Sequence, residues 1–141
     1  MEFLHRRAAD VDKIFNRIAT IGEPLTFESL EIFVRAHGQF VSLLADKLRR
    51  NQKATSFASK YMHFHNEAVP LYDHTFAAEA LKKLFFRQQV CAAPEGADKN
   101  YHRFAMLFWK AYCELRNRGL NPEVKLVDWW LVSSKGTPKY L

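Results

Sequence analysis

Apolar residues recur at spacings of three and four along nearly the whole of this chain, and they do not alternate with polar residues between turns. Such spacing places apolar side chains on one face of an α-helix, whereas strict alternation would indicate a β-strand. The stripe nearest the N-terminus contains Phe3, Leu4, Ala8, Val11, Ile14, Phe15 and Ile18. The sequence therefore predicts an all-α fold: a single helical domain of about six or seven helices over residues 1–132, followed by a flexible tail over residues 133–141.

Capping and turn residues predict where several helices begin and end. Thr26 is a suitable N-cap for a helix that Gly38 would end, and another helix is expected directly after it. Asp73 can cap the helix that follows it, and Asn121 with Pro122 would open the last helix. The side chains expected in the core include Phe15, Phe33, Leu44, Phe64, Leu81, Phe104, Phe108 and Trp130.

Composition and charge exclude several classes of protein. With 48% apolar residues among 141, the chain is long and hydrophobic enough to fold around its own core. No apolar run approaches the roughly 18 to 20 residues that span a bilayer, and the first residues lack the apolar core of a secretion signal. We therefore expect a cytoplasmic protein without a membrane partner. The formal net charge of +6 permits a polyanionic partner.

Cys91 and Cys113 are the only cysteines, and neither belongs to a Cys-x-x-Cys pair. This pattern disfavours a disulfide framework and a zinc knuckle. Each cysteine is expected to be a small core or boundary residue.

The segment 55–74, TSFASKYMHFHNEAVPLYDH, concentrates reactive side chains inside otherwise apolar sequence. Lys60 is expected one turn into a short helix that begins near Ser56. A lysine held among apolar neighbours loses hydration, which favours the neutral amine and makes it a better nucleophile toward an electrophilic carbon. The alternative is a lysine whose stem covers apolar surface while its ammonium reaches water.

The acidic residue and the histidines of this segment have both structural and chemical interpretations. Asp73 can cap a helix, and a carboxylate at a cleft can also stabilise a developing cation or orient a water. His63 and His65 are two apart on a helix and point about 200° from each other. No acidic residue stands at a usual metal-ligand spacing from them. We therefore expect His63, His65 and His74 to bond to the backbone or to Asp73, and we expect neither a metal nor a cofactor.

A basic run directly precedes the segment, with Lys47, Arg49, Arg50 and Lys53 within seven residues. These cations could displace counterions from a nucleic-acid backbone. They could equally form a solvated helix end, because cations are favourable at helix C-termini.

The run SFASKYMHFHNEAVPLYD resembles a stretch found in uncharacterised bacterial proteins, and it is similar in layout to DNA glycosylases of the helix-hairpin-helix class. In that class a lysine at the start of the hairpin's second helix attacks the sugar C1′, and an aspartate that caps the next helix assists. The resemblance implies that Lys60 is the nucleophile and Asp73 the assisting carboxylate, acting on a base flipped out of the duplex. The all-α fold would then be either half of a glycosylase-like architecture or a compact bundle.

The predicted partner is a nucleic acid, with DNA favoured. The side chains expected to contact it are Ser59, His63, His65, Tyr72, His74, Lys47, Arg49, Arg50 and Lys53. Two alternatives stay open. One is a non-catalytic helical module that binds nucleic acid or protein, and the other is a small all-α ribonuclease toxin, although the arginine and histidine that such toxins usually carry on one helix are missing here.

Overall fold

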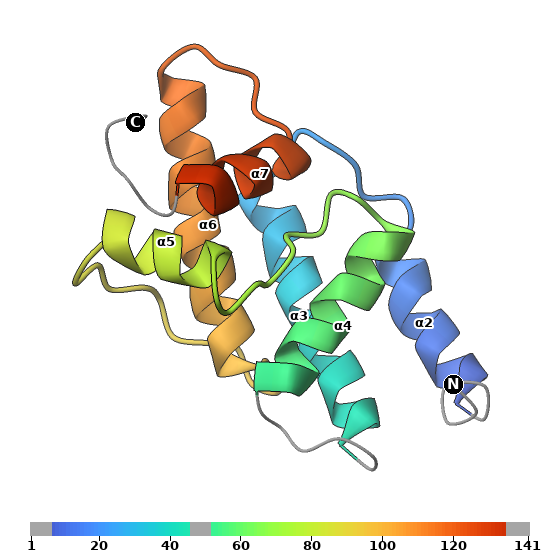
Figure 1. Ribbon diagram of the computed structural model, residues 1–141. Helices are drawn as coiled ribbons and strands as arrows, with labels where there is room; N and C mark the ends of the chain where they lie inside the picture. Colours follow the sequence, from blue (N-terminus) through green and yellow to red (C-terminus); the bar gives the residue numbers. More distant parts are fainter. Residues whose placement is uncertain (1–6, 46–51, 135–141) are drawn as a thin grey trace.

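The computed structural model describes residues 7–45 and 52–134, and all regular secondary structure within these residues is α-helical (Figure 1). The six helices are α2 (Ala8–Ile18), α3 (Phe27–Leu44), α4 (Gln52–His65), α5 (Ala77–Leu84), α6 (Lys99–Asn117) and α7 (Val124–Ser134). The prediction of an all-α fold is confirmed for this part of the chain. Helix α7 continues past the predicted domain end at residue 132, and the rest of the predicted tail lies outside the described residues.

Helix α3 lies at the centre of the fold. It packs against α2, α4 and α6, while α5 packs against α6 and α7 (Figure 1). One cluster of buried apolar side chains fills the space between the helices, and its largest members include Phe33 and Phe40 of α3 and Tyr101, Phe108 and Tyr112 of α6. No helix formed by the described residues is long and apolar enough to cross a bilayer.

Most of the predicted core residues lie in or against this cluster, but Phe64 does not. Buried as expected are Phe33, Leu44, Leu81, Phe104 and Phe108, and partly buried are Phe15 and Trp130. Phe64 is 83% exposed. The inward face of α4 is formed by Thr55, Ala58, Ser59 and Met62, which leaves position 64 on the opposite side of the helix. The prediction for Phe64 is wrong because small and polar residues pack inward here.

Gly38 does not end a helix, as the sequence predicts, but lies inside α3. The segment expected to form a separate helix is therefore the second half of α3. The backbone of Gly96 and Ala97, in the loop before α6, packs directly against Gly38. A Cβ added at Gly38 would meet the Gly96 carbonyl oxygen and would lie 2.8 Å from the Ala97 Cα. The glycine thus permits the close approach of two backbone segments.

The start of α3 follows the prediction, whereas the start of α7 does not. The Thr26 hydroxyl accepts a hydrogen bond from the Ser29 N–H at 3.0 Å, which caps α3 as expected. Helix α7 begins at Val124 and not at Pro122. The Val124 N–H donates to the Glu23 carboxylate at 2.6 Å, so a residue 101 positions earlier in the chain caps the last helix.

A buried polar network ties α3, α4 and α6 together. The Thr55 hydroxyl donates to Asp98 Oδ2 at 2.6 Å, while Asp98 Oδ1 accepts from the Tyr101 N–H at 2.9 Å and so caps α6. His37 Nε2 donates to the Thr55 carbonyl oxygen at 2.9 Å, and its ring stacks on Tyr101 at a centroid distance of 3.9 Å. The Tyr101 hydroxyl donates to the Pro70 carbonyl oxygen at 2.7 Å. The network therefore fixes both α4 and the segment that follows it, which carry the candidate site.

Candidate functional site

Lys60 and Asp73, the predicted nucleophile and assisting acid, line the same open pocket of about 560 Å³. Lys60 projects from α4, and Asp73 belongs to the segment that connects α4 to α5. The other lining residues are Ser56, Phe57, His74, Thr75 and Phe76. Lys60 is exposed, which agrees with the alternative of a lysine whose ammonium reaches water and not with a lysine held among apolar neighbours.

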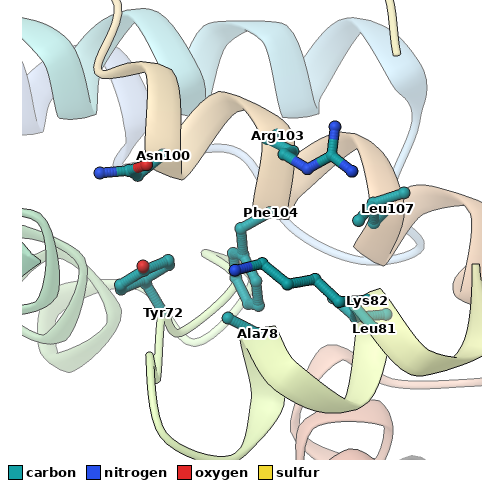
Figure 2. A pocket seen from close by; sticks show the side chains of 8 residues that line it. All are labelled: Tyr72, Ala78, Leu81, Lys82, Asn100, Arg103, Phe104 and Leu107. Carbon is teal, nitrogen blue, oxygen red and sulfur yellow. The ribbon is translucent and has the colours of Figure 1, made fainter. Parts of the chain in front are cut away.

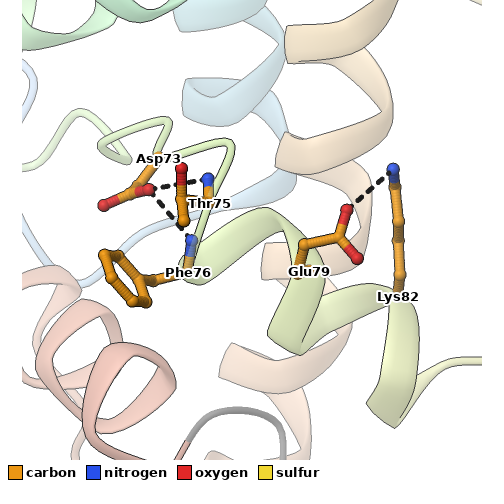
Figure 3. A network of polar contacts seen from close by, with 5 residues as sticks. All are labelled: Asp73, Thr75, Phe76, Glu79 and Lys82. Carbon is orange, nitrogen blue, oxygen red and sulfur yellow. Dashed lines mark hydrogen bonds and ion pairs between the residues drawn. The ribbon is translucent and has the colours of Figure 1, made fainter.

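Figure 3 shows Asp73 at the turn that leads into α5. Its Oδ1 accepts hydrogen bonds from the N–H groups of Thr75 at 2.9 Å and Phe76 at 3.0 Å. Both groups belong to the turn before α5, whose N-cap is Phe76 and which has no side-chain cap, so Asp73 closes this turn and does not cap the first turn of α5 as the sequence predicts. Both bonds use Oδ1, and Oδ2 points away from the turn (Figure 3). The two bonds therefore hold the carboxylate in place through Oδ1, and Oδ2 takes part in neither of them.

Ser59 and Tyr72 hold the connecting segment against α4 and do not line the Lys60 pocket. Ser59 is fully buried, and its hydroxyl donates to the Ser56 carbonyl oxygen at 3.1 Å and accepts from the Tyr72 N–H at 3.0 Å. The Tyr72 ring is also buried and meets Phe104 edge-on at a centroid distance of 5.3 Å. The predicted contact of Ser59 with a substrate is thus corrected: these residues position Asp73, which directly follows Tyr72.

Tyr72 lines a second pocket of about 150 Å³ between α5 and α6 (Figure 2). Lys82, Asn100 and Arg103 also line it, and Lys82 is paired with Glu79 at 3.4 Å (Figure 3). Burial raises the pKa of Tyr72, and nearby carboxylates raise it further, so its hydroxyl stays protonated at neutral pH. The two pockets share no lining residue, which leaves Tyr72 outside the candidate site.

The three histidines of the segment lie in different surroundings. His63 Nδ1 donates to the Val69 carbonyl oxygen at 2.7 Å, a backbone bond of the kind predicted. His65 is exposed and stacks on Phe15 of α2 at a centroid distance of 4.9 Å. His74 lines the Lys60 pocket, and its buried Nδ1 has no hydrogen-bond partner among the described residues. Of the three, His74 is the one placed with Lys60 and Asp73.

Asp128 on α7 is a further acidic residue near this site that the sequence did not single out. Its side chain is half-buried, and Oδ1 has no hydrogen-bond partner within residues 7–45 and 52–134. Burial raises the pKa of the Asp128 carboxyl, the nearby His63 lowers it, and the Asp73 carboxylate raises it. Asp128 therefore lies within electrostatic range of both His63 and Asp73. The signal that could have identified it is an acidic residue beside two tryptophans, Trp129 and Trp130, in the last helix.

The predicted basic run falls where the structure gives no side-chain detail. Lys47, Arg49 and Arg50 lie outside the described residues, and Lys53 is in the first turn of α4 but its side chain is likewise outside them. The proposed phosphate-facing patch stays a prediction.

The Lys60 pocket combines an amine, a carboxylate and an imidazole with the rings of Phe57 and Phe76. Such a set can support nucleophilic attack by the amine together with proton transfer. Within the described part of the chain, no group of three or more His, Cys, Asp or Glu side chains is arranged to hold a metal ion. Comparisons of the chain with protein-family models, with curated proteins and with solved structures found no match.

Proposed function

We propose that this domain binds DNA and that Lys60 attacks C1′ of a damaged or abasic nucleotide, with Asp73 assisting. The observation that carries this proposal is the shared pocket, because the amine and the carboxylate line one open cavity of about 560 Å³. An open pocket can admit a nucleotide rotated out of the duplex, which chemistry on a paired base requires. The net charge of +6 favours a polyanionic partner.

An abasic site is the simplest substrate for this chemistry, because its ring-opened sugar presents an aldehyde at C1′. The lone pair of the Lys60 nitrogen attacks that carbon, and the carbonyl oxygen leaves as water when the C=N bond forms. The proton that the lysine ammonium must first lose passes to Asp73 Oδ2 or to solvent. This Schiff base forms without an oxidant or a reductant.

The remaining lining residues suit a nucleotide. Phe57 is half-buried and Phe76 is 46% exposed, so each can offer ring surface to a base. Stacking of a base on an aromatic ring contributes about 1 to 3 kcal/mol and does not depend on which base is present.

The direct test of the proposal is reductive trapping. Incubation of the protein with an abasic duplex and borohydride is expected to give a covalent protein–DNA adduct, because a Schiff base is reducible. Lys60→Ala is expected to abolish the adduct. Asp73→Asn, which retains an oxygen for the turn before α5, is expected to slow trapping by about 10²-fold or more. The adduct is measured by gel mobility after denaturation.

The matched control is Lys13→Ala, which removes one exposed lysine from α2, outside the pocket. It is expected to trap DNA like the wild type, whereas an adduct that survives in Lys60→Ala would overturn the assignment of the nucleophile. Circular dichroism spectra of the variants show whether the helices are retained. No adduct from the wild type across several lesions would rule out the chemistry.

DNA binding itself is tested separately from the chemistry. Because phosphate contacts dominate non-specific binding, the protein is expected to retain duplex or single-stranded DNA at about 50 mM salt and to release most of it by about 200 mM. Fluorescence anisotropy across a salt series measures this. Binding without adduct formation would support the non-catalytic module in place of the enzyme, and folded protein that binds neither form of DNA at low salt would contradict both.

A further inference from the structure

A cluster of soft side chains lies apart from the Lys60 pocket, where the loop between α5 and α6 crosses α6. Cys91 of this loop has its Sγ 3.7 Å from Nε2 of His102 and 3.8 Å from Sδ of Met106. His102 and Met106 are four residues apart on α6, so their side chains lie on the same face of the helix. All three line a cavity of about 400 Å³ that also includes Glu31 and Arg35 of α3.

Two members of this cluster are held rigidly by the core, and the third reaches solvent. His102 is 4% exposed and Met106 is 5% exposed, whereas Cys91 is exposed. The contact of His102 Nε2 with a sulfur at 3.7 Å is weaker than an ordinary N–H···O bond. Glu31 lines the same cavity as the imidazole.

We propose that Cys91, His102 and Met106 form a binding site for a soft monovalent metal ion, Cu(I). Thiolate and thioether sulfurs are the ligands that select Cu(I), and a neutral imidazole is a suitable third ligand. Binding replaces the thiol proton of Cys91 with the metal and releases that proton to solvent. No change in the oxidation state of the protein or of the ion is involved.

The distances between the ligand atoms agree with three ligands around one ion. Metal–nitrogen and metal–sulfur bonds in protein sites are roughly 2.0 to 2.3 Å, so three ligands in a plane around an ion stand about 3.5 to 4.0 Å apart. The two distances that involve Cys91 Sγ, 3.7 and 3.8 Å, both fall in this interval. Cys91 Sγ therefore already stands at a ligand-to-ligand distance from each of the other two side chains.

The presence of Met106 favours a Cu(I) site over the two other common roles of a cysteine beside a histidine, which are a nucleophilic thiol and a zinc ligand. A thiol activated by an imidazole for nucleophilic attack has no need of a thioether 3.8 Å from its sulfur. Structural zinc requires four nitrogen, oxygen or thiolate ligands. A site with one thiolate, one imidazole and one thioether fits Cu(I) better than either.

The test is a Cu(I) titration of the whole chain under reducing conditions, in competition with a chromogenic Cu(I) chelator. The wild type is expected to withdraw one equivalent of Cu(I). Loss of a residue that only supports a metal ligand weakens metal binding by roughly 10- to 100-fold. Cys91→Ser removes a ligand itself, so it is expected to weaken Cu(I) binding by more than this. Met106→Leu, which conserves volume in the core, is expected to weaken binding about tenfold or more.

Two controls distinguish this site from a lone reactive thiol. Cys113→Ser removes the other cysteine, which is half-buried, and is expected to bind Cu(I) like the wild type. In protein labelled at the methionine methyl groups, the Met106 resonance is expected to shift with Cu(I), whereas that of the fully buried Met62 is not. The proposal would be overturned if the wild type took up no Cu(I), or if Cys91→Ser bound Cu(I) with unchanged affinity. It would also be overturned if Met106→Leu kept the wild-type affinity and the Met106 methyl resonance did not shift with Cu(I).

Discussion

Replacement of Gly38 by alanine is expected to lower the free energy of unfolding by about 1 to 3 kcal/mol, the range for overpacking a well-packed interior. At an exposed helix position the same change would stabilise, because alanine has the higher helix propensity by about 1 kcal/mol. At Gly38 the new Cβ would meet the Gly96 carbonyl oxygen and stand 2.8 Å from the Ala97 Cα. Both are backbone atoms, so the loop before α6 must move.

Gly22→Ala is the matched control, because a Cβ at Gly22 would have no atom within 4 Å. It is expected to leave the free energy of unfolding unchanged or to raise it by about 0.4 to 1 kcal/mol, because alanine reduces the conformational entropy of the unfolded chain. Urea unfolding of both variants and the wild type measures the two effects. If Gly38→Ala proved as stable as Gly22→Ala, the close approach of the two backbone segments would not be a constraint on the fold.

Acidification from pH 6.5 to about pH 4 is expected to remove about 3 kcal/mol of stability through His37 alone. Burial lowers the pKa of His37 from 6.5 to about 4, against the opposing effects of its bond to the Thr55 carbonyl and of the Asp98 charge. Between these pH values the unfolded chain binds a proton at this histidine that the folded chain does not. Stability therefore falls as pH falls through this interval, and this residue contributes no further loss below it.

Denaturant unfolding across a pH series measures this contribution. His37→Gln, which retains a donor toward Thr55, is expected to be less stable than the wild type at neutral pH and to lack this part of the pH dependence. His65→Gln removes an exposed histidine and is expected to follow the wild type. Equal pH dependence in His37→Gln and the wild type would show that His37 is not the group responsible.

The periodicity of apolar residues was sufficient to predict the class of fold, but not the face of every helix. In α4 the inward positions hold Thr55 and Ser59, which the core tolerates because Asp98 and the Tyr72 N–H satisfy their hydroxyls. A prediction based on hydrophobicity alone places Phe64 in the core instead of Thr55 and Ser59. Likewise, glycine often ends helices, so the sequence predicts that α3 stops at Gly38. The actual reason for the glycine is the loop that packs against it, and that loop is too distant in sequence to be foreseen.

The candidate site was partly predictable because Lys60, Asp73 and His74 belong to one short segment. Their meeting in a single pocket follows from a helix, a connector and a turn that are local in sequence. Asp128 and the contacts of Cys91 with His102 and Met106 depend on how separate helices pack. The sequence left open whether Lys60 is buried or exposed, because the answer depends on which side of α4 faces the core.

The hydrogen bond from Val124 to Glu23 also limits the order in which the chain can fold during its synthesis. Glu23 leaves the ribosome before α7 has been made, so its carboxylate cannot bond to Val124 until the last helix emerges. Closing so long a loop is entropically unfavourable, and nearer contacts form before it. The carboxylate of Glu23 therefore takes up its structural role only at the end of synthesis, when the last helix is added to the fold.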